Sequence, residues 1–362
     1  MPDAKVRPIT YAEAIREGLD QSMGADSRVI VIGEGVPDPK AIFGTTAGLR
    51  QKYGAKRVFD MPLAENGLTG ACIGAAMSGL RPVMVHQRID FALLAMDQLI
   101  NNAAKWHYMF DGKVSVPLVV RMIVGRGWGQ GPQHSQSLQA MFAQAPGLKV
   151  VMPSTAYDAK GMLIAAIEDN NPVLFIEHRW LHGIVDDVPE DMYRVALDEA
   201  KLLHNGNDVT IAAFSYMAIE ALSAAKALLA AMNIGADVLD MRGISPLDSR
   251  SVVDSVRKTG RLIVADTAMR SGSIAAELIS RVTEQAFDSL KARPVRMASP
   301  DHPAPTSHFM NEHYYPTART IADEILRLLG KAGESGAYRQ LCLLTRRSGP
   351  HDTPNREFRG PF

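Results

Sequence analysis

The sequence predicts an α/β protein with parallel sheets, divided into two domains. Continuous apolar runs at residues 28–32, 117–124 and 172–177 have the length and composition of strands buried on both faces. They alternate with longer segments of helical periodicity, as expected for a parallel sheet covered by helices. At 362 residues, the chain is long enough for two domains with full cores. We expect a first domain at 1–183, a polar linker at 184–197, a smaller second domain at 198–330 and an irregular tail at 331–362.

Local signals give the order of the elements. Thr10 and Glu13 form a capping box, which predicts a helix from about Tyr11. Ser154 is the expected cap of a helix at 157–167. The other predicted elements of the first domain are a strand ending at Pro62 with an exit turn at 63–67, helices at 68–78 and 91–104, and strands at 82–85 and 148–152. In the second domain we expect strands at 209–214, 236–241 and 262–266 and helices at 217–232, 274–287 and 321–329.

Charge and cysteine content exclude several classes of protein. Lys plus Arg and Asp plus Glu both number 39, so a formal net charge of zero argues against binding to nucleic acid or to an anionic membrane surface. Cys72 and Cys342 are too few for a disulfide framework or a thiolate metal site. Residues 1–7 lack the apolar core of a signal peptide, and no apolar run reaches membrane-spanning length. We therefore expect a soluble, cytoplasmic protein.

Two acidic residues lie where buried strands are predicted to end. Glu65 stands between a strand and a helix of small apolar residues, where poor solvation would raise its pKa and let it share a proton with a ligand. The alternative is an acid at a helix N-terminus stabilised by the macrodipole. Glu34 follows the strand at 28–32, at the sheet edge where α/β proteins bind ligands. A solvated loop acid is the alternative for Glu34.

A glycine-rich loop follows the strand at 117–124. Its glycines fall at 125, 127, 129 and 131, and Pro132 stands where a dinucleotide-binding helix would begin. That context argues against a Rossmann fingerprint and favours a mobile lid over an active site. His134 leaves this loop among polar neighbours and could transfer protons near neutral pH, although an ordinary surface histidine is also consistent with the sequence.

Several motifs occur in a fixed order. They are DMPLAENG at 60–67, GLRP at 79–82, AMDQ at 95–98, NNAAK at 101–105 and QHSQ at 133–136. This order resembles the beta subunit of the thiamine-diphosphate-dependent decarboxylase component of 2-oxo acid dehydrogenase complexes, including pyruvate, branched-chain and acetoin types. The resemblance covers roughly residues 5–328. It implies a transketolase-type pyrimidine-binding domain followed by a smaller transketolase-like C-terminal domain.

The resemblance assigns roles to single residues. It places Glu65 against a ring nitrogen of the cofactor pyrimidine, where proton sharing activates thiamine diphosphate for nucleophilic attack. Phe91 matches the aromatic residue that stacks on the pyrimidine, although a plain core role is also consistent, and Leu63 and Gln87 match further cofactor contacts. His134 matches the histidine that assists the later acyl-transfer steps. The family also implies a potassium ion held mainly by main-chain oxygens, at Leu118, Ala166, Ile167, Asp169 and Asn171.

One absence implies a partner. The family binds the diphosphate and Mg²⁺ through a Gly-Asp-Gly run followed by Asn, and this chain contains no Gly-Asp-Gly. We therefore expect half an active site, with Mg²⁺ supplied through an alpha subunit in an α2β2 heterotetramer that includes a beta–beta contact. The family also implies a lipoyl acyltransferase as acyl acceptor.

Some positions depart from the family pattern. His86 and Arg88 stand where many pyruvate-type members carry other residues, and we expect them to make that wall of the site more cationic. Leu94 replaces an acid found in some members, and residues 265–268 also differ. Two alternatives therefore remain: a carboligase or transketolase-like subunit that transfers a two-carbon unit to an aldehyde, and a non-catalytic assembly subunit. The sequence leaves the substrate, the acceptor and the identity of the alpha partner open.

Overall fold

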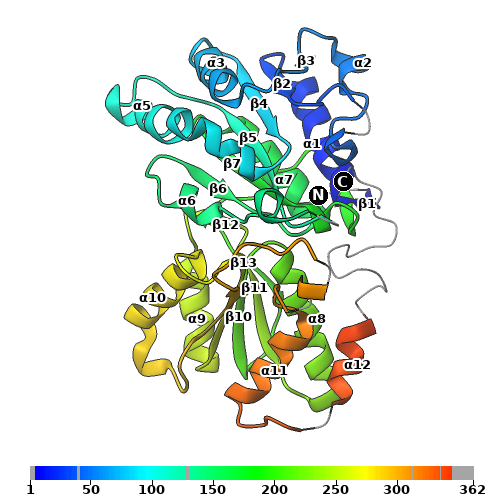
Figure 1. The fold of residues 1–362 in the computed structure, drawn as a ribbon, viewed down its shortest axis with the longest axis vertical. Coiled ribbons are helices and arrows are strands. Elements are labelled where there is room, and N and C mark those ends of the chain that lie inside the picture. The colour runs from blue at the N-terminus through cyan, green and yellow to red at the C-terminus, as the bar shows by residue number, and fades with distance from the viewer. Residues whose placement is uncertain are drawn as a thin grey trace. The chain divides into compact units, whose positions relative to one another are not determined.

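The structure is a computed structural model that describes residues 5–38, 41–127, 130–307, 309–311, 313–334 and 336–344. The chain forms two compact α/β units (Figure 1). The first contains the chain up to Gly125 together with Gln133–Leu197. The second contains Arg126–Pro132 and, from Asp198 onward, the described residues up to 344. The predicted fold class is confirmed.

The first unit is built on a parallel sheet. Its strands lie in the order β6 (Lys149–Val151), β7 (Val173–His178), β5 (Val119–Val124), β4 (Arg81–His86), β2 (Val29–Gly33) and β3 (Val58–Phe59). Every residue of β5 and β7 is buried, because helices cover both faces of the sheet, as the continuous apolar runs predict. The carboxyl ends of these strands therefore share one edge.

Two helices of this unit, α1 (Tyr11–Ala25) and α7 (Ala156–Glu168), pack against each other. The predicted capping box at α1 is present: the backbone N–H of Glu13 donates to Thr10 Oγ1 at 3.2 Å, and the backbone N–H of Thr10 donates to Glu13 Oε2 at 2.8 Å. The predicted cap of α7 is wrong by one residue. Thr155, not Ser154, accepts the hydrogen bond from the backbone N–H of Asp158, at 3.1 Å.

The segment from residue 63 to residue 109 differs from the expected pattern. Helix α3 (Glu65–Met77) begins three residues earlier than predicted, so Glu65 opens the helix instead of lying in a turn. The single helix expected at 91–104 is divided into α4 (Ile89–Ala92), a 3₁₀ turn η2 (Leu93–Ala95), a π-helix η3 (Asp97–Ala103) and α5 (Ala104–Met109). The amides of Asn101 and Asn102 both donate to Asp97, which stabilises the wider π-helical turn.

Part of the predicted linker is a strand. β8 (Val185–Pro189) pairs antiparallel with β1 (Val6–Thr10), so the expectation of an irregular segment at 184–197 is wrong for these residues. Val188 is the only fully buried residue of this pair of strands, so neither strand carries an apolar run that the sequence could reveal.

The second unit contains a mixed sheet. Its strands lie in the order β14 (Val295–Ser299), β13 (Leu262–Met269), β10 (Val209–Ala213), β11 (Ala236–Asp240) and β9 (Lys201–His204), and only the β11–β9 pair is antiparallel. Ile211 packs in the core that the sheet shares with α8 (Tyr216–Met232) and α11 (Ala318–Leu328). The adjacent Thr210 bonds instead to Ser255 and Thr259, at 2.7 Å each, on α9 (Ser249–Thr259). Helix α10 (Ile274–Ala286) packs against α9.

The predicted tail is partly helical. Helix α12 (Ala337–Leu344) packs on α8 and α11 of the same chain, with Tyr338 and Cys342 buried in their common core. An irregular tail at 331–362 is therefore wrong for this helix, and residues 345–362 lie outside the described ranges. The remaining short elements are η1 (Ala41–Gly44), α2 (Leu49–Tyr53), η4 (Pro132–His134), α6 (Gln139–Ala143), η5 (Arg179–Leu181), β12 (Gly243–Ser245), η6 (Phe287–Ser289) and η7 (Phe309–Asn311). Among the helices of the described ranges, none combines the length and the apolar character needed to cross a membrane.

Candidate active site

Polar residues gather at the carboxyl edge of the first sheet. Glu34 directly follows β2, His86 ends β4, and His178 ends β7. Gly125 follows β5 with a φ of +90°, and a Cβ atom there would lie 2.5 Å from the ring of His178. Only glycine allows the chain to pass this close. The sheet therefore concentrates its titratable groups at the edge where α/β proteins bind ligands.

Two buried carboxyl groups form the centre of this edge. Glu34 is 8% exposed and Glu65 is 6% exposed. The pKa of Glu34 is raised to about 7, first by burial and then by the charge of Glu65 and a hydrogen bond to it. The interpretation of Glu34 as a solvated loop acid is therefore wrong. Glu65 lies in the first turn of α3, so the helix dipole also acts on it.

This carboxyl pair gives a prediction about stability. Because the folded-state pKa of Glu34 lies near 7, its contribution to stability is fully present below about pH 4.5 and is lost as the pH rises through 7. We expect Glu34→Gln to raise the thermal midpoint by a few degrees at pH 8 and to change it little at pH 5, as measured by scanning calorimetry. A lower midpoint at pH 8 would instead mean that the carboxylate is stabilised by its surroundings.

The wall formed by residues 86–90 is not cationic, and that expectation is wrong. Burial lowers the pKa of His86 to about 4, although the charge of Glu65 opposes the shift, so the ring is neutral at physiological pH. Arg88 forms a buried ion pair with Asp90 at 3.4 Å and donates to the carbonyl of Gly125 at 2.6 Å. Within the described residues, neither ring nitrogen of His86 has a hydrogen-bond partner.

Asp90 also fixes the segment that carries His134. Its Oδ1 accepts hydrogen bonds from the side chain of Gln136 at 2.9 Å and from the backbone N–H of Gln136 at 3.3 Å. Two residues earlier, His134 meets the ring of Phe91 edge-on, with 5.4 Å between ring centroids. The structure thus brings together two residues that the sequence predicts for the site. It adds Asp90 and Gln136, which the sequence analysis did not assign.

The other predicted cofactor contacts lie close by. The side chain of Gln87 donates to the backbone carbonyl of Glu34 at 3.4 Å and is otherwise exposed. Leu63 lies two residues before α3 and is 83% exposed. Residues 128 and 129 of the predicted lid lie outside the described ranges. The loop residues before and after them are linked, because Arg126 Nε donates to the carbonyl of Gln130 at 2.8 Å.

The predicted potassium ligands lie together at the opposite edge of the sheet. Leu118 precedes β5, and its carbonyl accepts the N–H of Val173 at 2.9 Å; Ala166, Ile167, Asp169 and Asn171 lie at the end of α7 and in the turn that leads to β7. Arg81 Nη1 donates to the carbonyls of Ile167 and Asp169 at 2.9 Å each. Two of the five predicted main-chain ligands therefore already contact a cationic group.

A fully buried ion pair lies below the site. Arg121 of β5 donates to both carboxylate oxygens of Glu177 on β7, at 2.6 and 2.9 Å. His182 lies 2.9 Å from the same carboxylate, and Thr45 accepts from Arg121 at 3.0 Å. Burial alone would raise the pKa of Glu177, but Arg121 and His182 lower it to about 2. The sequence analysis treated both residues only as parts of apolar strands.

Comparison with known proteins defines the class first. The family model of the transketolase pyrimidine-binding domain matches residues 7–183, and that of the transketolase C-terminal domain matches residues 198–321. A solved structure described as a split-gene transketolase, in an inactive beta4 tetramer, has the same fold, with a TM-score of 0.72 and 24% identity, covering 90% of this chain and 99% of that one. The chain is thus a transketolase-type α/β protein.

The relatives then define the family. The chain is 43% identical over 327 residues to the beta subunit of acetoin:2,6-dichlorophenolindophenol oxidoreductase from Cupriavidus necator, covering 87% of this chain and 96% of that one. It is 40% identical over 322 residues to the pyruvate dehydrogenase E1 component subunit beta of Porphyra purpurea, covering 88% of this chain and 96% of that one. The chain belongs to the family of acetoin and pyruvate dehydrogenase beta subunits.

Proposed function

We propose that this chain contributes the pyrimidine half of the active site of a thiamine-diphosphate-dependent 2-oxo acid or acetoin dehydrogenase. The observation that carries the proposal is the buried pair of Glu34 and Glu65 at the carboxyl edge of the first sheet. Two carboxyl groups that hold one proton near neutral pH are suited to share it with a basic ring nitrogen. Thiamine diphosphate would supply nucleophilic chemistry toward the substrate carbonyl, and Glu65, Phe91, Leu63 and Gln87 would hold its pyrimidine.

The residues of this edge then have distinct roles. We assign proton exchange with the bound pyrimidine to Glu65, and the neighbouring Glu34, whose pKa is raised to about 7, supports it. The half-buried ring of Phe91 offers a face for stacking, and Leu63 and Gln87 line the same edge. His134 is held against Phe91 and is close enough to exchange protons with a group bound there.

An alpha partner in an α2β2 assembly is part of the proposal. The sequence contains no Gly-Asp-Gly run, the family's motif for Mg²⁺ and the diphosphate, so we assign that half of the site to another chain. The surface of α3, η2 and α5 supplies a docking face of exposed apolar side chains: Met77, Leu80, Leu93, Leu94, Tyr108, Met109 and Phe110. Large exposed apolar groups on neighbouring elements are typical of a subunit interface.

Further parts of the proposal follow the family. We assign a beta–beta contact and a lipoyl acyltransferase as possible acyl acceptor to the same assembly. A potassium ion would use the remaining lone pairs of the main-chain carbonyls of Leu118, Ala166, Ile167, Asp169 and Asn171, since a carbonyl oxygen accepts two bonds. We also place the protein in the cytoplasm, where the buried thiols of Cys72 and Cys342 stay reduced.

Cofactor binding with and without a partner tests the proposal. The chain is purified alone and co-expressed with an alpha-type subunit from the same organism, and each sample is titrated with thiamine diphosphate in the presence and absence of Mg²⁺. We expect saturable, Mg²⁺-dependent binding only in the mixed complex, with affinity at least about a hundredfold above that of the isolated chain. The complex is then assayed with acetoin and with 2-oxo acids, using 2,6-dichlorophenolindophenol as electron acceptor.

Two outcomes would contradict the proposal. Tight Mg²⁺-dependent binding by the isolated chain would place a diphosphate site in this chain. No binding in a stable mixed complex would favour a non-catalytic assembly subunit.

A further inference from the structure

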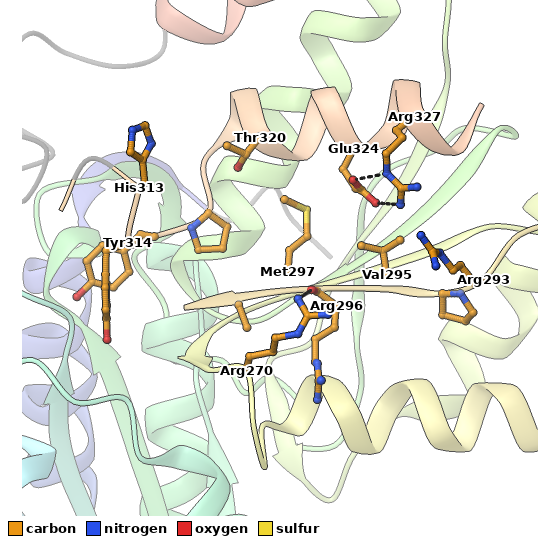
Figure 2. A pocket seen from close by; sticks show the side chains of 14 residues that line it. Arg270, Arg293, Val295, Arg296, Met297, His313, Tyr314, Thr320, Glu324 and Arg327 are labelled. Carbon is orange, nitrogen blue, oxygen red and sulfur yellow. Dashed lines mark hydrogen bonds and ion pairs between the residues drawn. The ribbon is translucent and has the colours of Figure 1, made fainter. Parts of the chain in front are cut away.

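A cavity in the second unit is lined only by residues of that unit. Its volume is about 630 Å³, which is within the usual range for sites that hold small ligands. One wall is formed by residues 293–298, which include most of β14, the outermost strand of the sheet. The facing wall is one side of α11, where Thr320, Glu324 and Arg327 recur at helical spacing. Figure 2 shows α11 above β14, with Met297 between them.

Positive charge dominates the lining. Arg270, Arg293, Arg296 and Arg327 line the cavity together with His313, against Glu324 as the single lining carboxylate. Glu324 is already engaged: Arg327 Nε donates to its Oε2 at 2.9 Å, and Arg327 Nη2 donates to its Oε1. Among the described residues, no carboxylate forms an ion pair with any of the other three arginines.

Arg270 and Arg293 are exposed lining arginines that, unlike Arg327, form no ion pair among the described residues, so they are the best placed to bind a ligand. Arg270 makes only a long hydrogen bond, 3.4 Å, to the carbonyl of Arg296. Hydrogen bonds from Ser271, at 2.7 and 2.8 Å, lower the pKa of Asp301, and the charges of Arg296 and Arg270 lower it further. Asp301 and Glu324 together offset two positive charges, so the four arginines of the lining leave an excess of guanidinium groups.

The remaining lining is apolar or aromatic. Val295 and Met297 face the cavity from β14, and Tyr314 forms its opposite end with His313 (Figure 2). Guanidinium groups bind phosphate through two parallel N–H donors, and aromatic or thioether walls accept a flat or apolar group. The combination fits a ligand with a phosphate at one end and a less polar body.

We propose that this cavity binds a phosphorylated small molecule of nucleotide size, with its phosphate groups bound by the lining arginines, chiefly Arg270 and Arg293. The cavity shares no lining residue with the carboxyl edge of the first sheet, and the proposal does not depend on the function proposed for that edge. Nothing in the reaction of a dehydrogenase beta subunit requires an anion at this position, so binding here would be an additional property of the chain.

Calorimetric titration of the full-length chain tests the site, with ADP, inorganic pyrophosphate and adenosine as probes. We expect one ADP per chain, weaker binding of pyrophosphate, and no binding of adenosine. Arg270→Ala and Arg293→Ala should each weaken ADP binding by about tenfold or more, because each removes a charge-assisted hydrogen bond to phosphate. Arg250→Ala is the matched control, since Arg250 is a highly exposed arginine of the same unit, on α9 and outside the cavity, and should leave the affinity unchanged.

A variant that should strengthen ADP binding distinguishes a direct effect on the site from damage to the fold. Glu324→Gln removes the only lining carboxylate and releases Arg327, so ADP should bind about threefold to tenfold more tightly. Loss of structure cannot tighten binding. Glu65→Gln should leave ADP binding unchanged. The proposal is overturned if neither ADP nor pyrophosphate binds, or if the Arg270 and Arg293 variants bind ADP as tightly as the wild type does. It is also overturned if the chain binds a glutamate-rich decapeptide but not ADP or pyrophosphate.

Discussion

Glu65→Gln lowers the turnover of the assembled enzyme by a factor of about 10² to 10⁴, the range contributed by a positioned proton-transfer group. Glutamine keeps the shape of the side chain but cannot hold or give up a proton. Glu65 is 6% exposed beside Glu34, so water cannot easily take over its role. The measurement is kcat with acetoin or a 2-oxo acid in the alpha-containing complex, with 2,6-dichlorophenolindophenol as electron acceptor.

A matched variant shows whether the loss is specific. Glu168→Gln changes an exposed glutamate of the same unit that pairs with Arg194 at the surface, and it should leave turnover unchanged. The thermal midpoint of Glu65→Gln should not fall below that of the wild type, since the substitution removes one of two neighbouring buried carboxyl groups. Turnover within threefold of the wild-type value would refute the catalytic assignment and favour the assembly-subunit interpretation.

The buried central strands of both units could be predicted because buried parallel strands leave a clear trace in composition, whereas the half-buried strands β9 and β14 were not predicted. The fully buried β5 and β7 coincide with the apolar runs at 117–124 and 172–177. The paired strands β1 and β8 could not, because they carry polar side chains and their pairing joins positions more than 170 residues apart. A strand held by a distant partner has no local signal of its own.

The helical region after β4 was predicted in part. Its apolar positions fit a continuous helix, but the π-helix η3 depends on side-chain hydrogen bonds from Asn101 and Asn102 to Asp97. Helix propensity does not show whether polar residues in a sequence will form such hydrogen bonds or will simply face solvent. The division of this region into α4, η2, η3 and α5 matters for function, because η2 and α5 carry part of the exposed apolar surface proposed as the docking face.

For the candidate site, the sequence predicted where single residues lie but not how they interact. The positions of Glu34 and Glu65 at strand ends were predictable, but their proximity and the resulting rise in the pKa of Glu34 depend on the fold. The charge of residues 86–90 was predicted to be positive but is close to zero, because burial keeps His86 neutral and Asp90 pairs with Arg88. Residue type alone does not fix the charge of a buried group.

Arg121→Met should lower the free energy of unfolding by about 3–5 kcal/mol, the usual cost of breaking a buried ion pair from one side. The substitution leaves the carboxylate of Glu177 fully buried without the guanidinium that donates to both of its oxygens. The loss should be read as a shift of the urea midpoint at pH 7. Arg194→Met, at the exposed pair with Glu168, is the matched control and should leave the midpoint nearly unchanged.

The pH dependence of the stability of Arg121→Met tests whether the unpaired charge of Glu177 causes the loss. The folded-state pKa of Glu177 is depressed to about 2, so its contribution to stability is present above about pH 4.5 and is lost as the pH falls toward 2. The difference between wild type and Arg121→Met should therefore narrow as the pH is lowered from 7 to 3. Arg121→Met combined with Glu177→Leu should recover part of the loss, because two apolar side chains leave no unpaired charge in the interior. A double variant less stable than Arg121→Met alone would mean that Glu177 is held mainly by His182, whose Nε2 lies 2.9 Å from the carboxylate.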